Sequence, residues 1–367
     1  IVLTFANAGY QKFFDNWLGH TLQLGWQNRI VVGAIDDAMY TKATDAGLLV
    51  VSMNSTESLA ESLGITMHEE VKGASFTDKD FRGNSHTFHK MGGEKAALVL
   101  GFLELGMEVL LSDSDTVWLR DPWEYLAAIP DADIMISSDC PSIYGDRIRE
   151  KGPERSRCTH HQGSREDIKF NTGVLYFRPT TGGAAFVKAW VKRLLTSGNL
   201  VYDQEAFNQL AEQGIKPIKL VESGSRIFHA WFNKMKLGIL PASHFCNGHT
   251  FFVQKRPQQL GLHPFVVHPT FQIEGPVGKI SRFRESNLWL SDDEAYYSEG
   301  KFLTYSPEVP RHVYEGLTGL KAHLAITAYH QWAVRNAFAL GRILGRIVVL
   351  PQLLCFCDMY WGSPILP

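Results

Sequence analysis

Short apolar runs alternate with amphipathic segments through the first half of the chain. The runs at residues 2–6, 30–35 and 48–53 predict strands with both faces buried. Apolar residues recur at helical spacing over residues 13–22, and residues 94–105 predict a second helix directly before another strand. Strands that alternate with helices in this way are typical of a parallel sheet covered by helices on both faces.

The alternation continues less regularly in the middle of the chain. Residues 134–136, 170–177 and 265–267 predict three further strands. Residues 184–195 and 203–211 predict helices, and the second of them begins with acidic residues that suit a helix N-terminus. The pattern therefore predicts that the α/β arrangement extends beyond the first half.

The character of the chain changes after about residue 279. Residues 281–307 read as an extended, wrapping segment, and residues 313–367 predict two helices and a tail. We therefore predict two domains. The first spans residues 1–280, and the second, residues 281–367, consists of the wrapping segment and of helices packed on the first domain.

A long polar loop joins two of the predicted strands. It spans residues 141–169, carries five arginines and Tyr144, and exceeds the usual length of connections in compact domains. Because both strands lead to the expected ligand-binding edge, we predict that the loop forms part of an acceptor site and becomes ordered when ligands bind. The alternative is a variable surface excursion held by a Cys140–Cys158 disulfide.

The segment VLLSDSDTVWL, residues 109–119, ends a predicted buried strand in two carboxylates. Asp113 and Asp115 stand two positions apart and bracket Ser114. Paired carboxylates at the carboxyl end of a strand suit a hard divalent cation, which can also hold a diphosphate. The alternative is an acidic turn that caps the next helix, although residues 120–122, Arg-Asp-Pro, predict an ordered turn there.

Two other predicted strands also end in polar residues. Asn7 follows the first strand, and Asp36 follows the second. Since open parallel sheets bind ligands at the carboxyl ends of their strands, we expect Asn7, Asp36 and Asp113 to lie along one edge of the sheet.

Length, charge and cysteine content exclude some classes of protein. A chain of 367 residues can form one large domain or two modest ones, and its net charge of −2 argues against nucleic acid as a main partner. Five cysteines are too few for a disulfide scaffold. No window offers about 20 uninterrupted apolar residues. Because the chain begins at Ile1, inside an apolar run, we expect any membrane anchor to lie outside this fragment.

Several alternative chemistries find little support in the sequence. It has no Walker-type phosphate loop, no G-x-G-x-x-G and no G-x-S-x-G motif. The run from Cys158 to His161 lacks a second pair of zinc ligands at suitable spacing. Asp113 and Asp115 also fit the nucleophile motif of haloacid-dehalogenase-like phosphatases, for which Asp292 and Asp293 are a faint echo of the second carboxylate pair.

Four segments in a fixed order resemble glycosyltransferase family 77, whose members are similar to nucleotide-sugar transferases of the GT-A fold. These segments are LLSDSDTVWLRDPW, FNTGVLYFRPT, DQEAFNQL and VVHPTFQ. The later run HPTFQIEGPVGKISRFRE, followed by LTYSP, further resembles plant and green-algal arabinosyltransferases that act on extensins. The resemblance covers residues 1 to about 310. It implies an α/β fold of the GT-A type, Rossmann-like with a mixed central sheet, and a helical C-terminal extension.

The resemblance assigns a metal site and a donor site. Asp113 and Asp115 match the metal-binding pair, with Mn²⁺ as the expected ion, and His268 resembles the late histidine that completes its coordination. Imidazole together with carboxylates suits Mn²⁺ better than Mg²⁺. The alternative for His268 is a core histidine beside a proline turn. The residues expected to contact the UDP-sugar donor are Thr4, Ala6, Asn7 and Lys95, with Lys95 either on a phosphate or at a solvated helix position.

The implied reaction is transfer of L-arabinofuranose from UDP-β-L-arabinofuranose, with retention at the anomeric carbon, to hydroxyproline-linked arabinosides of extensin-like glycoproteins. The candidates for the group on the far face of the sugar are Asp203, Gln204 and Asn171, although Asp203 is also suited to cap a helix. The implied location is the Golgi lumen, with the full-length protein anchored by an N-terminal membrane segment. The alternatives are transfer of xylose or galactose, a phosphatase that uses Asp113, and a sugar-binding relative without catalytic activity.

Overall fold

The computed structural model describes residues 1–53, 56–72, 85–143, 145–146, 169–197, 201–215, 218–306, 308–351 and 353. Contacts divide the chain into two units: among the described residues, the first reaches Lys279 and the second begins at Ile280. Each unit is described by itself.

The larger sheet of the first unit has eight strands among the described residues, in the order β3-β2-β1-β4-β7-β6-β9-β8. Its strands are β1 (Val2–Ala6), β2 (Ile30–Ala34), β3 (Leu49–Ser52), β4 (Val109–Ser112), β6 (Ile134–Ser138), β7 (Phe170–Phe177), β8 (Ile227–Ala230) and β9 (Met235–Ile239). The first four in sheet order run parallel, whereas β7 is antiparallel to both β4 and β6. The sheet is therefore mixed, and the predicted α/β fold class is confirmed.

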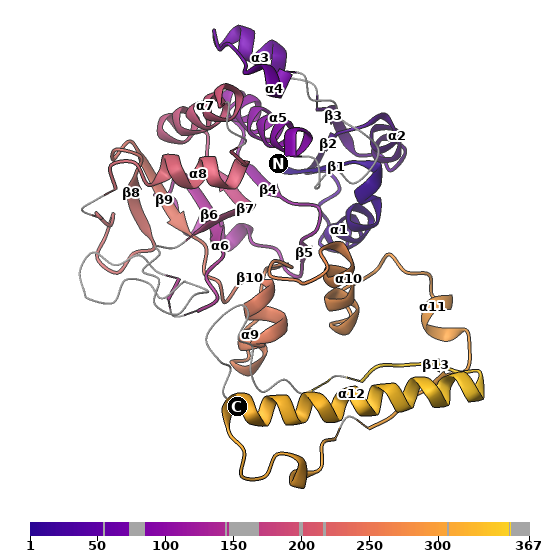
Figure 1. Cartoon of the computed structure of the whole chain (residues 1–367). Helices are drawn as coiled ribbons and strands as arrows, with labels where there is room; N and C mark the ends of the chain where they lie inside the picture. Colours follow the sequence, from indigo (N-terminus) through magenta and orange to yellow (C-terminus); the bar gives the residue numbers. More distant parts are fainter. Residues whose placement is uncertain are drawn as a thin grey trace. The chain divides into compact units, whose positions relative to one another are not determined.

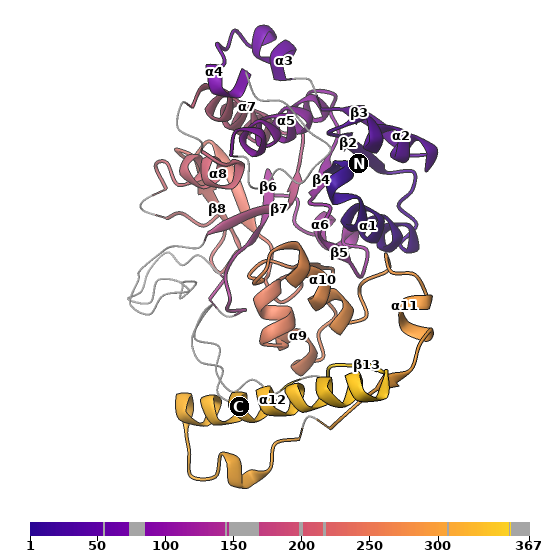
Figure 2. The ribbon, with the colours of Figure 1, turned by 45° about the vertical axis from the view of Figure 1, so that its right-hand side comes forward.

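Helices cover both faces of this sheet (Figures 1 and 2). One face packs against α3 (Thr56–Ser62), α4 (Glu69–Lys72), α5 (Ser85–Glu104), α7 (Thr181–Thr196) and α8 (Asp203–Ala211). The other packs against α1 (Gln11–Gln23), α2 (Asp37–Asp45) and α6 (Trp123–Ala127). Successive residues of β4 alternate between the two cores, Val109 and Leu111 on one side and Leu110 on the other. All four β4 residues are buried, as expected for a strand between two helical layers.

The helix α5 begins nine residues earlier than the predicted start at residue 94. Gly92 and Gly93 obscure its pattern in the sequence, yet both lie at close approaches between helices. A Cβ at Gly92 would come within 3.0 Å of the Asp203 Cβ, and one at Gly93 within 3.2 Å of Leu195 Cδ2. The two glycines therefore allow α5 to pack closely against α7 and α8. This packing fixes the position of the α5 side chains at the edge of the sheet.

A second, three-stranded sheet in the first unit has the order β10-β11-β5. Its strands are β5 (Val117–Trp118), β10 (Phe245–Asn247) and β11 (Val266–His268). The strand β5 follows β4 after a short turn and pairs antiparallel with β11, so that Val117 lies opposite Val267. This pairing connects the end of β4 to a segment that is about 150 residues later in the sequence. The remaining helices of the unit are η1 (Ala8–Tyr10), η2 (His249–Val253) and α9 (Arg256–Gln259).

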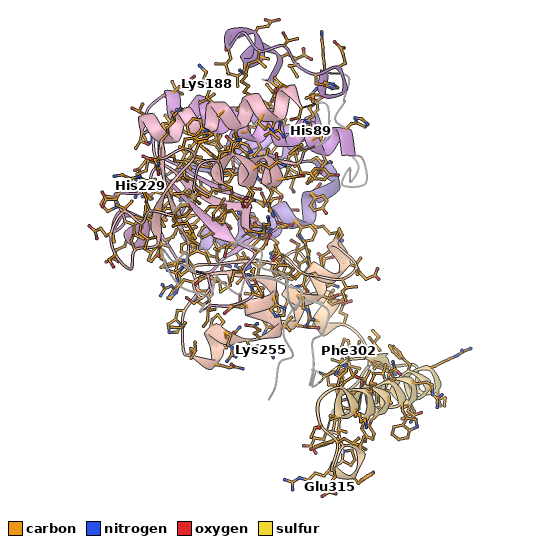
Figure 3. The ribbon with its side chains drawn as sticks, turned by 60° about the vertical axis from the view of Figure 1, so that its left-hand side comes forward. His89, Lys188, His229, Lys255, Phe302 and Glu315 are labelled. Atoms are coloured by element: carbon orange, nitrogen blue, oxygen red, sulfur yellow. The ribbon has the colours of Figure 1, made fainter. Side chains whose placement is uncertain are left out.

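The second unit differs from its sequence prediction in two places. The segment expected to be extended begins within α10 (Pro276–Glu285), which starts in the first unit. In the described part of residues 313–367, where two helices were expected, there is one 26-residue α-helix, α12 (Gly319–Leu344); it contains no proline, and Gly345 ends it in the left-handed conformation. The other elements are α11 (Ala295–Ser298), β12 (Phe302–Leu303), η3 (Arg311–Val313) and β13 (Ile347–Val348). Figure 3 labels Phe302 and Glu315 in this unit.

Candidate functional site

The two carboxylates of the Asp-x-Asp segment stand on a tight turn between β4 and β5. Thr116 closes the turn, because its backbone N–H and its hydroxyl both donate to the Asp113 carbonyl, at 3.1 and 2.9 Å. Ser112 anchors the turn from below: its Oγ accepts from the Nε1 atoms of Trp17 and Trp118 at 2.9 and 3.0 Å. The turn is therefore rigid and part of the core, which excludes a solvated acidic loop.

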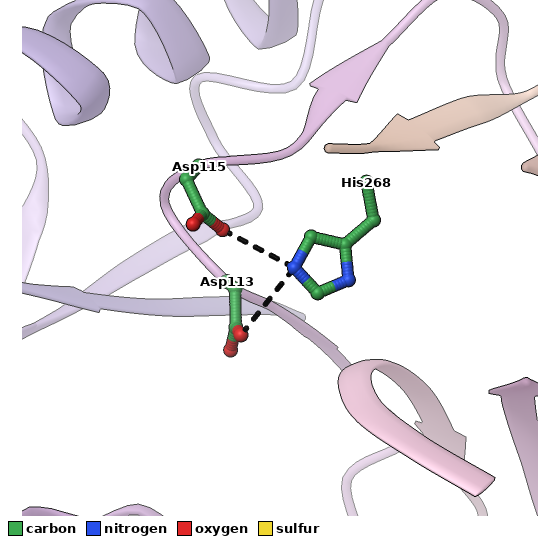
Figure 4. Close-up of side chains that lie close together, drawn as sticks. All are labelled: Asp113, Asp115 and His268. Atoms are coloured by element: carbon green, nitrogen blue, oxygen red, sulfur yellow. Dashed lines mark ion pairs between the residues drawn. The ribbon is translucent and has the colours of Figure 1, made fainter. Parts of the chain in front are cut away.

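The strand pairing between β5 and β11 delivers His268 to the same turn. Its Nε2 lies 3.4 Å from Asp115 Oδ1 and 3.9 Å from Asp113 Oδ2 (Figure 4). One ligand atom from each of the three residues lies within 4.8 Å of the others. Asp115 and His268 are buried, while the Asp113 side chain is 28% exposed. The three side chains thus face a common point. This point is accessible to solvent on the side of Asp113.

The orientation of the imidazole is set by β7. The His268 Nδ1 lies 3.0 Å from Asn171 Oδ1, which also accepts from the Gly173 N–H at 2.9 Å. An amide oxygen only accepts, so Nδ1 carries a proton and Nε2 is the nitrogen that faces the two aspartates. A Cβ at Gly173 would overlap the His268 ring, and only glycine leaves room for the ring at this place.

These residues fit a divalent cation. Two carboxylates and one imidazole nitrogen are a donor set that suits Mn²⁺. The second hydrogen bond of His268, on Nδ1, is the arrangement that proteins use to orient a metal-binding histidine. The cradle left by Gly173 is a further sign that His268 is held there for ligation rather than for packing.

Two lysines contact the acidic turn from opposite sides. Lys95 of α5 is buried, and its Nζ donates to Asp113 Oδ1 at 3.1 Å, to Asp203 Oδ2 at 3.0 Å and to the Thr172 carbonyl at 2.8 Å. Burial by itself would lower the pKa of Lys95, but the charges of Asp113 and Asp203 raise it overall. Lys279 at the end of the first unit donates to Asp115 Oδ2 at 2.6 Å. The two ammonium groups therefore partly offset the negative charge of Asp113, Asp115 and Asp203.

A cavity of about 280 Å³ opens at this edge of the sheet. The residues that line it are Phe5, Ala6, Asn7, Tyr10, Ile35, Phe88, Met91, Lys95, Asp113, Ser114, Asp115, Asn171, Thr172, Tyr202, Asp203, Gln204, His268 and Lys279. They come from the ends of β1, β2, β4, β7 and β11, from η1 and α5, and from the first residues of α8 and α10. Following the strand order, one end is mainly apolar, at β1 and β2, and the other is polar, at β7 and α8.

Nine of the ten site residues predicted from the sequence line this cavity. The exception is Thr4, which is fully buried within β1 and does not reach the cavity. The prediction that Lys95 reaches the site agrees with its position, whereas the alternative of a solvated helix position is wrong because the side chain is buried. Asp36 does not line the cavity; its carboxylate accepts from the Met39 and Ala8 N–H groups and caps α2.

Asp203 and Gln204 open α8 beside the cavity. Asp203 is the first residue of the helix, and its carboxylate makes no capping bond; Oδ2 instead accepts from Lys95 Nζ and from Thr172 Oγ1, each at 3.0 Å. The alternative of a simple helix cap is therefore wrong. Gln204 Nε2 donates to Asp139 Oδ2 at 3.0 Å. The catalytic roles expected for both residues stay predictions.

Sequence reasoning missed three residues of the site. Lys279 lies in a segment with little pattern, and its contact with Asp115 spans 164 residues of sequence. Thr172 stands between Asn171 and Gly173, which were considered, and Asp139 ends β6 as Asp113 ends β4. The carboxylate at the end of β6 follows the same rule of strand ends that identified Asp113.

Other sequence predictions lie elsewhere in the structure or outside it. Asp292 accepts two bonds from Arg284 within the second unit, at 2.7 and 2.6 Å, and this pairing lowers the pKa of the Asp292 carboxyl. Asp292 is thus committed to a structural ion pair. Cys140 is disulfide-bonded, but its expected partner Cys158 and nearly all of the predicted lid, residues 141–169, lie outside the described residues. None of the described helices is long and apolar enough to cross a membrane.

Comparison with known proteins shows which family the sequence matches. The family model described as nucleotide-diphospho-sugar transferase matches residues 25–283. Arabinosyltransferase XEG113 of Arabidopsis thaliana is 34% identical over 99% of this chain and 52% of its own length. UDP-D-xylose:L-fucose alpha-1,3-D-xylosyltransferase 3 of the same plant is 30% identical over 61% of this chain and 54% of its own. This chain therefore spans about half the length of these relatives.

Solved structures give a weaker likeness. Mouse xyloside xylosyltransferase 1, in its apo form, has a TM-score of 0.40 at 12% identity, over 74% of this chain and 97% of that one.

Proposed function

Because this chain belongs to the nucleotide-diphospho-sugar transferase family, we propose that it transfers L-arabinofuranose from UDP-β-L-arabinofuranose to hydroxyproline-linked arabinosides of extensin-like glycoproteins. The sugar and acceptor are inferred from the arabinosyltransferase that is 34% identical over nearly the whole chain. The observation that carries the proposal is the convergence of Asp113, Asp115 and His268 on one point at the wall of the cavity. The Golgi lumen, where such glycoproteins mature, is the proposed location.

Asp113, Asp115 and His268 would hold Mn²⁺ in this cavity. When bound, the ion supplies positive charge to the diphosphate of the departing UDP, which is commonly the largest electrostatic contribution in such reactions. Lys279 adds a second positive charge, since its ammonium already lies beside Asp115 and can turn to a phosphate oxygen. The apolar end of the cavity, with Ala6 and Tyr10, would receive the uracil and ribose.

The polar end of the cavity would hold the arabinose. Asp203 is charge-balanced there by Lys95 and accepts two hydrogen bonds on one oxygen, which weakens it as a nucleophile. We therefore assign the role of steadying positive charge at the anomeric carbon to the Gln204 carbonyl, whose amide is held in place by Asp139. With no covalent intermediate on Asp203, the departing phosphate would take the proton of the acceptor hydroxyl on the face that it leaves.

A donor panel tests the proposal. Purified protein with Mn²⁺ and a hydroxyproline-arabinoside acceptor is offered UDP-β-L-arabinofuranose, UDP-xylose and UDP-galactose, and the released UDP is measured. We expect acceptor-dependent release with the arabinofuranose donor and much less with the others. Preference for UDP-xylose would instead favour the xylosyltransferase activity named for another relative, and release from none of them would contradict the proposal.

A further inference from the structure

A single carboxylate, Asp139, connects the predicted metal ligand His268 with Gln204. It follows β6 directly, and its backbone N–H donates to the Lys169 carbonyl at 2.9 Å. Its Oδ1 accepts from Asn171 Nδ2 and its Oδ2 from Gln204 Nε2, each at 3.0 Å. Two carboxamides from different elements, β7 and α8, thus share one carboxylate.

An irregularity in the sheet explains why Asp139 can reach both amides. Ile136 of β6 lies opposite Leu175 of β7, but the next residue, Ser137, lies opposite Asn171. Three residues of β7, 172–174, therefore have no partner in the register between Ile136 and Ser137, which are consecutive in β6. A bulge of this kind bends a strand and re-aims its side chains. Here it places Asn171 between Asp139 and His268.

The hydrogen-bonding capacity of a carboxylate then fixes both amides. An ionised carboxylate only accepts, so Asn171 and Gln204 must each present their NH₂ group to Asp139. Asn171 consequently presents Oδ1 on its other side, where it accepts from Gly173 N and from the Nδ1 proton of His268. With a proton held on Nδ1 by Asn171, Nε2 is the ring atom that faces Asp113 and Asp115 and is left for a cation.

The hydrogen bond to Asp139 also orients the Gln204 amide. Its NH₂ group is taken by Asp139, so Oε1 points towards the backbone N–H of Thr172 at 3.4 Å, at the wall of the cavity. The long distance of this second bond leaves the oxygen available to a ligand.

We propose that Asp139 is a positioning residue that sets the tautomer of His268 through Asn171 and, through Gln204, aims a carbonyl oxygen into the cavity. It touches neither the metal nor the donor. The proposal rests on the proposed function in one respect, namely that Asp113, Asp115 and His268 bind a divalent cation.

The test measures Mn²⁺ binding without any donor, by the loss of the free-ion electron paramagnetic resonance signal. Asp139→Asn removes the acceptor-only group, so Asn171 can turn over and present its NH₂ to His268. We expect Mn²⁺ affinity to fall about 10–100-fold, the usual effect of losing such a supporting group. The matched control is Asp133→Asn at the other end of β6, whose carboxylate binds Thr180 and the Lys236 backbone, away from the cavity. It should leave Mn²⁺ affinity unchanged.

A reciprocal exchange separates orientation from general damage. In Asp139→Asn/Asn171→Asp, the carboxylate at 171 accepts from His268, from Gly173 N and from the new amide, whose oxygen still accepts from Gln204. We expect this double variant to regain most of the Mn²⁺ affinity lost in Asp139→Asn. Wild-type affinity in Asp139→Asn, or a double variant as weak as the single one, would overturn the proposal.

A measurement on the wild-type protein covers the case in which Asp139→Asn fails to fold. Nitrogen-15 chemical shifts of neutral histidines distinguish the two tautomers, and His268→Gln identifies the His268 signals. We expect a proton on Nδ1 of His268, with or without a second proton on Nε2; a ring protonated on Nε2 alone would refute the proposal. Failure of the wild type to bind Mn²⁺ would instead contradict the proposed function, while the tautomer would still test the role of Asp139.

Discussion

At the scale of the residue, the site depends on which atom of each side chain faces the cavity. Asp115 is the most constrained of the metal-binding candidates: it is buried on a turn pinned by the core and shared between His268 and Lys279.

We therefore expect Asp115→Ala to abolish UDP-sugar turnover while the fold is retained. Loss of such electrostatic stabilisation commonly lowers turnover ~100-fold or more. The measurement is UDP release at saturating Mn²⁺, with circular dichroism and the melting temperature as checks of folding. Turnover that remains within tenfold of wild type would rule out the metal-binding role.

For His268→Ala we expect a different signature. The two carboxylates remain, so Mn²⁺ should bind at least tenfold more weakly, and excess Mn²⁺ should restore part of the turnover. His263→Ala, an exposed histidine of the preceding loop, is the control and should leave the Mn²⁺ dependence unchanged. An unaltered Mn²⁺ dependence in His268→Ala would identify His268 as a packing residue.

Most of these residues could be predicted from the sequence, because open α/β sheets bind ligands at the carboxyl ends of their strands. Asp113 and Asn7 could be located from the ends of apolar runs, and Asn171 and His268 from the resemblance. Lys279 was missed because its role depends on a contact over 164 residues of sequence, which no local pattern records. Asp139 follows a strand end, but its contact with Asn171, 32 residues later, could not be read from that position. Thr4 was misplaced because it is fully buried within β1 and does not line the cavity.

At the scale of the element, the bulge of β7 and the approach of α5 assemble the site. Strands and helices with strong periodicity could be predicted closely: β1 and α8 have the predicted bounds. The long α12 could not, because alanines and glycines blur its pattern into two segments. The bulge was also beyond prediction, since the sequence of β7 does not show its register against β6.

The bulge predicts a strict requirement for glycine at residue 173. In Gly173→Ala, the new Cβ would overlap the His268 ring and force it away from Asp113 and Asp115. We expect Mn²⁺ affinity to fall as far as in His268→Ala. Gly101→Ala is the control, because it lies in α5 with open space at the Cβ position and should stabilise the helix by roughly 0.5–1 kcal/mol. Wild-type Mn²⁺ affinity in Gly173→Ala would contradict the geometry.

The approach of α5 predicts a stability effect at Lys95. Lys95→Met leaves Asp113 and Asp203 without their buried counter-charge, which should reduce the free energy of unfolding of the first unit by about 3–5 kcal/mol. Lys188→Met on the exposed side of α7 (Figure 3) is the control and should change it little. Urea unfolding at neutral pH measures both. A loss no greater than that of the control would show that the ion pairs are dispensable.

The pH dependence of this contribution has a definite sign. The pKa of Lys95 is raised in the folded protein, so its stabilising contribution is complete below the pKa of about 10.4 found in unfolded chains. It is lost only as the pH rises through the raised value. Lys95 therefore stays charged at neutral pH and keeps Asp113 and Asp203 paired.

At the scale of the whole molecule, the first unit contains the complete cavity and every described residue assigned to the reaction. Assignment of catalysis to residues 1–280 stays a prediction, as does the role of the loop at residues 141–169 as a lid. The fold class could be predicted from periodicity, and the family from four ordered motifs. The donor sugar could not, because related sugars differ by single hydroxyl contacts that these motifs do not encode.

The proposed reaction is the transfer of arabinofuranose by this chain, with a cation held by Asp113, Asp115 and His268. Its most direct test is mass spectrometry of an arabinosylated hydroxyproline peptide incubated with UDP-β-L-arabinofuranose and Mn²⁺. We predict the addition of a pentose by the wild-type protein, which is lost when Mn²⁺ is chelated and in Asp113→Ala/Asp115→Ala. Pentose addition by that double variant at the wild-type rate, or none by the wild type with any acceptor arabinoside, would contradict the account.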